Sequence, residues 1–184
     1  AAFGCFANSG QICMSTERLI VDSKIADEFV KKFVAKASAL PLGDPRKPEP
    51  VVLGSVIGMN TVEHCNQLID DAVGKGAKLM CGGKATSTLM PATVLDHVTP
   101  AMRIYHEETF GPVKCVVRVS GVDEAIACAN DTEYGLSSAV FGGDIARAFT
   151  VAQRIDSGIC HVNGPTVHDE AQMPFGGVKG SGMG

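Results

Sequence analysis

Short apolar runs alternate along the chain with segments in which apolar residues recur every three or four positions. The runs, rich in valine, isoleucine and leucine, predict β-strands, and the longer period predicts helices with one buried face. Strands are predicted at residues 18–22, 78–81, 92–98, 113–119, 136–141 and 159–162. Helices are predicted at residues 24–34, 62–73, 122–130 and 144–155.

Local signals mark the ends of the first two helices. Ser23 is placed to cap the helix that begins at Lys24. The apolar positions of this helix, which recur at helical spacing, are Ile25, Phe29, Phe33 and Val34. The proline-rich stretch at 41–50 breaks regular structure, and Gly74 and Gly76 end the second helix.

The regular change from strand to helix is typical of βαβ units, in which helices pack on a parallel sheet. We therefore predict an α/β fold, a three-layer sandwich with helices on both faces of a mainly parallel sheet. In such folds ligands gather at the carboxyl ends of the strands. The 184 residues are enough for one well-buried core, and we predict a single domain over residues 1–184.

Composition and charge exclude several classes of protein. Hydrophobic residues make up 45% of the chain, yet no run approaches the ~18 apolar residues that a membrane helix needs. The first four residues lack the basic start and apolar core of a signal peptide, and without an initial methionine we expect a piece of a longer protein. A net charge of -4 without clustered lysine or arginine argues against binding to nucleic acid.

Seven cysteines, an odd number without a paired Cys-x-x-Cys pattern, argue against a disulfide framework, a zinc site and a redox motif. A reducing, cytoplasmic setting fits best, and we expect no metal site. Buried positions are expected for the cysteines within helix and strand patterns, because free cysteine behaves as a small hydrophobe. These are Cys65, Cys81, Cys115, Cys128 and Cys160.

Cys13 differs from the others because it follows a Gly-Gln pair in a stretch with few signals of regular structure. A reactive cysteine needs partial access and a lowered pKa, whereas a buried one is inert. On its own, the residue type favours burial. The segment Phe-Ala-Asn-Ser-Gly-Gln-Ile-Cys, however, resembles the Phe-x-Asn-x-Gly-Gln-x-Cys motif of the aldehyde dehydrogenase superfamily. The resemblance implies that Cys13 is the nucleophile, with Ile12 and Met14 beside it facing substrate or buried.

A second segment, Glu107 to Val113, places two carboxylates and an aromatic ring before the strongest predicted strand. On chemistry alone this is an acidic surface turn that Phe110 anchors in the core. It also resembles the Glu-Glu-x-Phe-Gly-Pro motif of the same family. The resemblance implies that Glu108 contacts the nicotinamide ribose and that Phe110 positions the nicotinamide of NAD or NADP.

Two further matches lie near the end of the chain. Pro174-Phe175-Gly176-Gly177 and the residues after it resemble a family motif whose phenylalanine, here Phe175, lines the aldehyde pocket or packs in the core. Residues 161–175 resemble the loop of the branch that includes vanillin and salicylaldehyde dehydrogenases. The substrate is therefore expected to be an aromatic aldehyde. The resemblance gives His161 and His168 no acid-base role.

The resemblance implies a catalytic domain that oxidises an aldehyde to a carboxylic acid through a thiohemiacetal and a thioester on Cys13. The family's general-base glutamate and its main nucleotide-binding domain lie upstream of the cysteine motif, and neither is matched here. The segment used for oligomerisation also lies elsewhere. We therefore expect the isolated chain to be inactive, and the whole protein to be a homo-oligomer with an upstream cofactor-binding domain.

Two other functions remain open from the residues. A thiol acyltransferase or esterase would also use Cys13 but would transfer no hydride. A non-catalytic binding domain would keep the scaffold without the chemistry, although packing alone does not require the cysteine and Glu-Glu-x-Phe motifs. Fold analogy by itself does not decide among the three.

Overall fold

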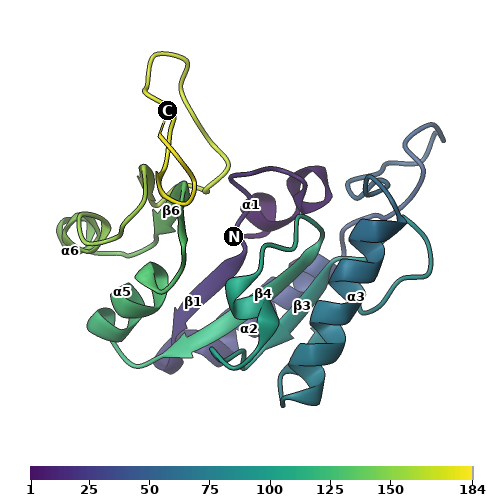
Figure 1. The fold of residues 1–184 in the computed structure, drawn as a ribbon, viewed down its shortest axis with the longest axis horizontal. Coiled ribbons are helices and arrows are strands. Elements are labelled where there is room, and N and C mark those ends of the chain that lie inside the picture. The colour runs from purple at the N-terminus through teal and green to yellow at the C-terminus, as the bar shows by residue number, and fades with distance from the viewer. Residues whose placement is uncertain (184) are drawn as a thin grey trace.

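A computed structural model describes residues 1–183 and has a four-stranded sheet at its centre (Figure 1). The strands lie in the order β1 (Arg18–Asp22), β4 (Val113–Val119), β3 (Thr93–Asp96) and β2 (Lys78–Cys81). β1 and β3 run parallel to β4, and β2 runs antiparallel to β3. The predicted bounds of β1, β2 and β4 are confirmed, and β3 is shorter than the predicted 92–98.

Two long helices cover opposite faces of this sheet, α2 (Ser23–Ser38) and α3 (Met59–Gly74) (Figure 1). Successive residues of a strand point to opposite faces, and β4 shows the consequence. Val116 belongs to the apolar cluster that includes Val30 and Phe33 of α2, whereas Val117 belongs to the cluster that includes Leu68 of α3. The three-layer α/β fold is therefore confirmed.

The start of α2 differs from the prediction by one residue. Asp22, not Ser23, caps the helix, because its carboxylate accepts the Lys24 N–H at 2.9 Å. The Ser23 hydroxyl donates instead to the Val119 carbonyl oxygen at 2.9 Å and ties the helix to the end of β4. Ile25 is 58% exposed, so its place in the buried face was predicted wrongly.

The remaining elements form two small sheets beside the central one. β6 (Ser137–Val140) runs parallel to β7 (Ile159–Val162), and β5 (Tyr134–Gly135) runs antiparallel to β8 (Val178–Lys179). The helices of this part are α5 (Val122–Asn130) and α6 (Ile145–Ala152). The predicted elements at 122–130 and 159–162 are confirmed, and those at 136–141 and 144–155 are shorter.

A groove of about 1010 Å³ separates β1 from β6, and every residue of these two strands lines it. Among the described residues, β1 pairs only with β4 and β6 only with β7. One edge of each strand is therefore unpaired at the groove. Figure 1 shows β6, α5 and α6 grouped on one side of β1.

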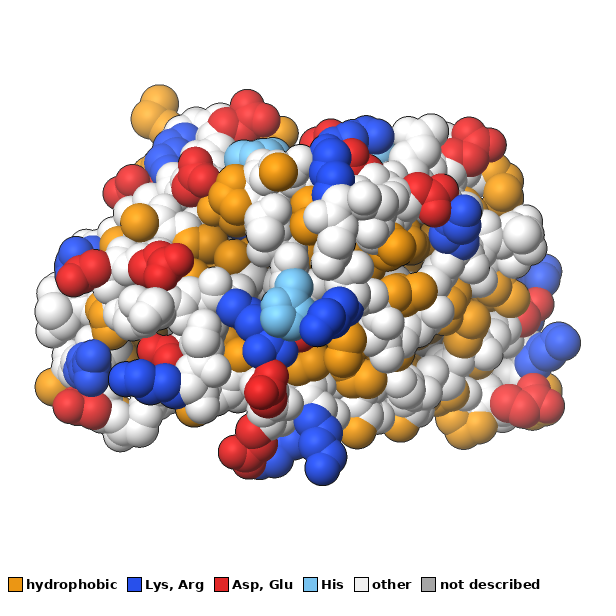
Figure 2. Space-filling model, turned by 90° about the horizontal axis from the view of Figure 1, so that it is seen from below, with side chains coloured by type: hydrophobic (Ala, Val, Ile, Leu, Met, Phe, Trp, Pro, Cys, Tyr) orange, Lys and Arg blue, Asp and Glu red, His pale blue; other side chains and the backbone are white. Residues whose placement is uncertain are grey.

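Charges of both signs are mixed with apolar side chains on the face shown in Figure 2. Within residues 1–183, no helix has the length and apolar character needed to cross a bilayer.

Candidate active site

The candidate nucleophile follows two short helical segments, α1 (Ala2–Phe6) and the 3-10 turn η1 (Ala7–Gly10). α1 is regular, whereas the turn directly before Cys13 is not. Asn8, Ser9 and Gly10 have φ values of 50°, 58° and 76°, in the left-handed region. Non-glycine residues enter this region at a cost, so other contacts must hold the turn.

Side chains of the motif supply these contacts. The Asn8 side-chain amide donates to the Gln11 carbonyl oxygen at 3.2 Å, and the Gln11 amide donates to the Asn8 carbonyl oxygen at 3.2 Å. The Gln11 side-chain oxygen also accepts the Ile57 N–H at 2.8 Å. Asn8 and Gln11 therefore fix the backbone that leads to Cys13, a role that the sequence analysis missed.

Hydrogen bonds also fix the backbone that follows Cys13. The Ser15 N–H donates to the Ile12 carbonyl oxygen at 2.8 Å and closes a turn around Cys13. The Thr16 N–H and the Ser15 hydroxyl both donate to the Gly4 carbonyl oxygen, at 2.9 and 3.2 Å. The turn therefore presents Cys13 at the surface.

Cys13 is the exposed member of the seven free cysteines. Cys5, Cys65, Cys115 and Cys128 are buried, as the prediction for the last three expected, and Cys81 and Cys160 are half-buried. Burial raises the pKa of Cys5 and Cys65 to about 11 and that of Cys115 to about 12. Because the thiolate is the nucleophile, these three thiols are unreactive near neutral pH.

The Glu-Glu-x-Phe motif follows α4 (Arg103–His106) and gives its two glutamates different surroundings. Arg103 binds Glu107 through two hydrogen bonds of 2.7 and 2.8 Å. Glu108 is left exposed and lines the groove. The pKa of Glu108 lies above its ordinary value, because the protein around its carboxylate displaces water and the negative charge of Glu17 acts in the same direction.

Phe110 is 41% exposed and has a left-handed φ of 44°. It does not anchor the turn in the core, so that alternative is wrong. A partly exposed ring held in a strained backbone conformation needs support from its neighbours.

The cysteine turn and this second turn touch directly. A methyl group placed on Gly10 would overlap the carbonyl oxygen of Gly111. A methyl group on Gly111 would lie 2.7 Å from the sulfur of Cys65. Glycine at position 10 is therefore required for the two motifs to lie against each other, and glycine at position 111 leaves room for Cys65 of α3.

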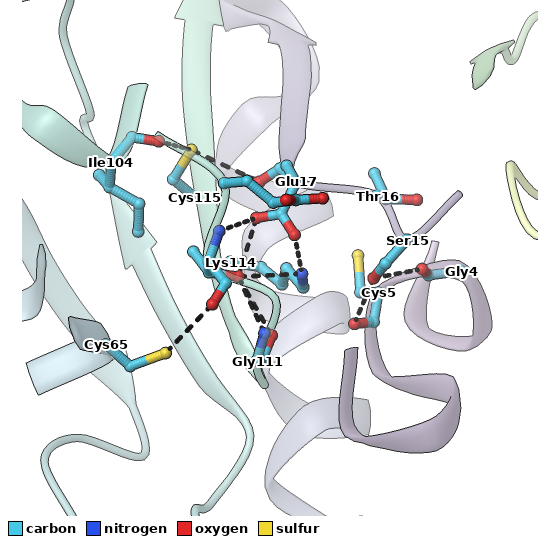
Figure 3. A network of polar contacts seen from close by, with 12 residues as sticks. Gly4, Cys5, Ser15, Thr16, Glu17, Cys65, Ile104, Gly111, Lys114 and Cys115 are labelled. Carbon is cyan, nitrogen blue, oxygen red and sulfur yellow. Dashed lines mark hydrogen bonds and ion pairs between the residues drawn. The ribbon is translucent and has the colours of Figure 1, made fainter. Parts of the chain in front are cut away.

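A partly buried ion pair joins Glu17, which follows the cysteine turn, to Lys114 of β4 (Figure 3). Lys114 of β4 is 0% exposed, and its ammonium group donates to Glu17 at 2.8 Å. The other carboxylate oxygen of Glu17 accepts the N–H and the hydroxyl of Thr109, at 3.1 and 2.8 Å. This network was not predicted from the sequence, although a lysine inside the strongest apolar strand was a signal for it.

The structure thus brings Cys13 and Glu108 to the same groove. Of the other predicted site residues, Ile12 and Met14 are half-buried, and Phe110 and Phe175 are 41% and 43% exposed. None of these four is among the residues that line the groove. Within residues 1–183, no group of three His, Cys, Asp or Glu side chains is placed to hold a metal ion.

A model of the aldehyde dehydrogenase family matches residues 1–184. The chain belongs to this family. It is 56% identical over 184 residues to a vanillin dehydrogenase from Pseudomonas fluorescens, of which it covers 38%. It matches the crystal structure of a salicylaldehyde dehydrogenase from Pseudomonas putida G7 complexed with salicylaldehyde with a TM-score of 0.97, at 55% identity over all of this chain and 38% of that one.

A solved structure with lower sequence identity has the same fold. The NADP-dependent glyceraldehyde-3-phosphate dehydrogenase from Bacillus halodurans C-125, solved with NADP, gives a TM-score of 0.95 at 37% identity over all of this chain and 38% of that one. These matches confirm the predicted family and the resemblance to the branch of vanillin and salicylaldehyde dehydrogenases. The chain spans 38% of the length of the curated vanillin dehydrogenase that it matches.

Proposed function

We propose that this chain is the catalytic domain of a longer NAD(P)-dependent aldehyde dehydrogenase that oxidises an aromatic aldehyde to the carboxylic acid. The observation that carries the proposal is the exposed thiol of Cys13 at the same groove as the carboxylate of Glu108. A covalent oxidation needs a nucleophile and a group suited to a ribose hydroxyl at one site, and the groove holds both.

In the proposed reaction, the Cys13 thiolate attacks the aldehyde carbon, and the carbonyl electron pair moves onto oxygen. Among the hydrogen bonds of residues 1–183, none uses the backbone N–H of Cys13, so it can donate to that oxygen. Once the hydride has left the carbon, a thioester remains on Cys13. Water then releases the acid and returns the thiol.

The residues of the second turn fit a nicotinamide cofactor. Glu108 offers an exposed carboxylate to a ribose hydroxyl, and the partly exposed ring of Phe110 can lie against a planar group. NAD or NADP, when bound, supplies the acceptor for the hydride. The choice between NAD and NADP belongs to residues upstream.

An aromatic substrate is supported by the resemblance of residues 161–175 to the loop of the vanillin and salicylaldehyde branch. Ile12, Met14 and Phe175 are proposed to line the pocket in which the aldehyde binds. Binding pockets are mostly apolar, and partly exposed apolar side chains fit such a role.

The rest of the protein is proposed to include an upstream cofactor-binding domain, a general-base glutamate and a segment for homo-oligomer formation. The unpaired edges of β1 and β6 support this proposal, because further polypeptide can pair with the two open strand edges that line the groove. Seven free thiols support a reducing, cytoplasmic setting.

The test assays the whole protein with aromatic and aliphatic aldehydes and with both cofactors. We expect one reduced cofactor for each acid formed, with a higher kcat/KM for aromatic aldehydes. Cleavage of activated esters with no reduced cofactor from any aldehyde would instead identify an acyltransferase or esterase.

A further inference from the structure

Lys114 is a charged side chain at a position where an apolar one would pack more easily. It lies in β4, between Val113 and Cys115, and like them it is fully buried. Its ammonium group has two acceptors among the described residues, a Glu17 oxygen at 2.8 Å and the Thr109 hydroxyl at 3.3 Å. Burial of an ammonium ion costs several kcal/mol before its partner is counted, so a buried pair is weak evidence for stability.

Glu17 and Thr109, the two acceptors of Lys114, lie in the two segments that carry the candidate site residues. Glu17 is four residues after Cys13, directly before β1. Thr109 stands between Glu108 and Phe110, and it is 1% exposed. The Glu17 carboxylate therefore connects the segment that presents the nucleophile to Thr109, which lies between the two proposed cofactor contacts.

The bonds to Glu17 hold both hydrogen-bond donors of Thr109. Its N–H and its hydroxyl donate to the same carboxylate oxygen, at 3.1 and 2.8 Å. Two bonds to one residue limit its rotation, and bonds to a charged acceptor are stronger than neutral ones. Phe110, the next residue, has the left-handed backbone that needs such support.

We propose that Glu17 and Lys114 are positioning residues, which hold the Glu108–Phe110 turn at a fixed place relative to Cys13. Lys114 orients the Glu17 carboxylate, and Glu17 holds Thr109. The inference rests on the proposed function, because it explains the position of the Glu108–Phe110 turn relative to Cys13 by the need to bring the cofactor to the nucleophile. It predicts that loss of the Glu17 acceptor weakens use of the cofactor and leaves the reactivity of the thiol intact.

Two double variants of the whole protein separate this role from simple stabilisation. Glu17→Gln with Lys114→Met removes both charges but keeps a side-chain oxygen that can accept from Thr109. Glu17→Leu with Lys114→Met removes both charges and the acceptor. Neither variant leaves an unpaired buried charge, which is the usual cause of failure to fold.

The matched control is Glu107→Gln, because the Glu107 carboxylate lies next to Glu108 in sequence and, among residues 1–183, binds Arg103 and not the Glu17 network. The assays are the KM for the nicotinamide cofactor, kcat, and the rate of Cys13 alkylation by iodoacetamide without cofactor. We expect the Leu variant to raise the cofactor KM at least about tenfold, as the loss of charged hydrogen bonds does. The Gln variant should stay within about threefold of the control, and alkylation of Cys13 within about twofold in all three.

Equal cofactor KM values for the Gln and Leu variants would overturn the positioning role. So would a loss of Cys13 alkylation that parallels the loss of activity, because that result describes general damage to the site. If the unsubstituted whole protein reduces no cofactor with any aldehyde, the proposed function fails first and the inference with it.

Discussion

Gly10 lies against the carbonyl group of Gly111, and this close approach brings the turn before Cys13 next to the Glu108–Phe110 turn. A side chain on Gly10 would collide with the Gly111 carbonyl group, and the φ of 76° disfavours any residue with a Cβ. Since the obstacle is backbone, it cannot be relieved by a change of rotamer.

The substitution Gly10→Ala is therefore expected to destabilise the protein by about 2–4 kcal/mol, from the strained backbone and the overlap together. Urea unfolding measures the effect. Gly76→Ala is the control, because Gly76 also has a positive φ, of 102°, but an added Cβ would meet no atom within 4 Å. It should cost about 1 kcal/mol. Equal losses would show that the contact with Gly111 contributes nothing.

Cys13→Ser in the whole protein is expected to lower kcat for aldehyde oxidation at least about a thousandfold, because a hydroxyl is a much weaker nucleophile than a thiolate. Cofactor binding, measured by titration, should be unchanged. Cys160→Ser, a change at a half-buried thiol, is the control and should keep its activity. Full activity of Cys13→Ser would exclude the proposed chemistry.

Thiol labelling should single out Cys13. At pH 8, a thiol with a pKa of about 11, as for Cys5 and Cys65, is ionised in about one molecule in a thousand. A mass-tagged iodoacetamide should therefore modify Cys13 first, and the buried thiols only when the pH rises toward their pKa or the protein unfolds. Labelling without preference for Cys13 would favour a non-catalytic domain.

The isolated 184 residues are expected to produce no reduced cofactor with any aldehyde. The reason is the lack of a match to the family's general-base glutamate and main nucleotide-binding domain, without which the thioester is not hydrolysed and the cofactor is not held. Assay of the purified chain at high concentration measures this. Turnover by the isolated chain would contradict the expectation.

Hydrogen exchange tests whether further chain fills the groove. Amide hydrogens at the open edges of β1 and β6 should exchange at least about tenfold more slowly in the whole protein than in the isolated chain. The amides of α3, which lies on the other side of the sheet from α2, serve as the internal reference. Equal exchange rates in the whole protein and the isolated chain, at both edges, would show that the groove stays open in the whole protein.

Most elements could be predicted because their signals are local. The run Val113–Val119 and the helix Val122–Asn130 have the same bounds in sequence and structure. The two-residue strands β5 and β8 could not be predicted, because each exists through pairing with a segment more than 40 residues away. Two residues are too few to show the alternation of apolar and polar positions that predicts a strand.

The candidate site likewise contains residues that the sequence could predict and residues that it could not. Cys13, Glu108 and Phe110 stand out in continuous motifs, and the resemblance to a family gave them roles. The partnership of Glu17 with Lys114 spans 97 positions and depends on which strands are neighbours, so no local pattern contains it. Asn8 and Gln11 are part of the motif, but their reciprocal bonds follow from left-handed turns that sequence alone does not specify.

The open edges of β1 and β6 also bear on how this chain behaves when it is handled alone. Unpaired strand edges are templates to which another polypeptide adds by backbone pairing, and β1 carries Leu19, Ile20 and Val21 along its length. Copies of the separate chain can therefore associate edge to edge and aggregate. Recombinant work on these 184 residues should therefore monitor association of copies through these two edges.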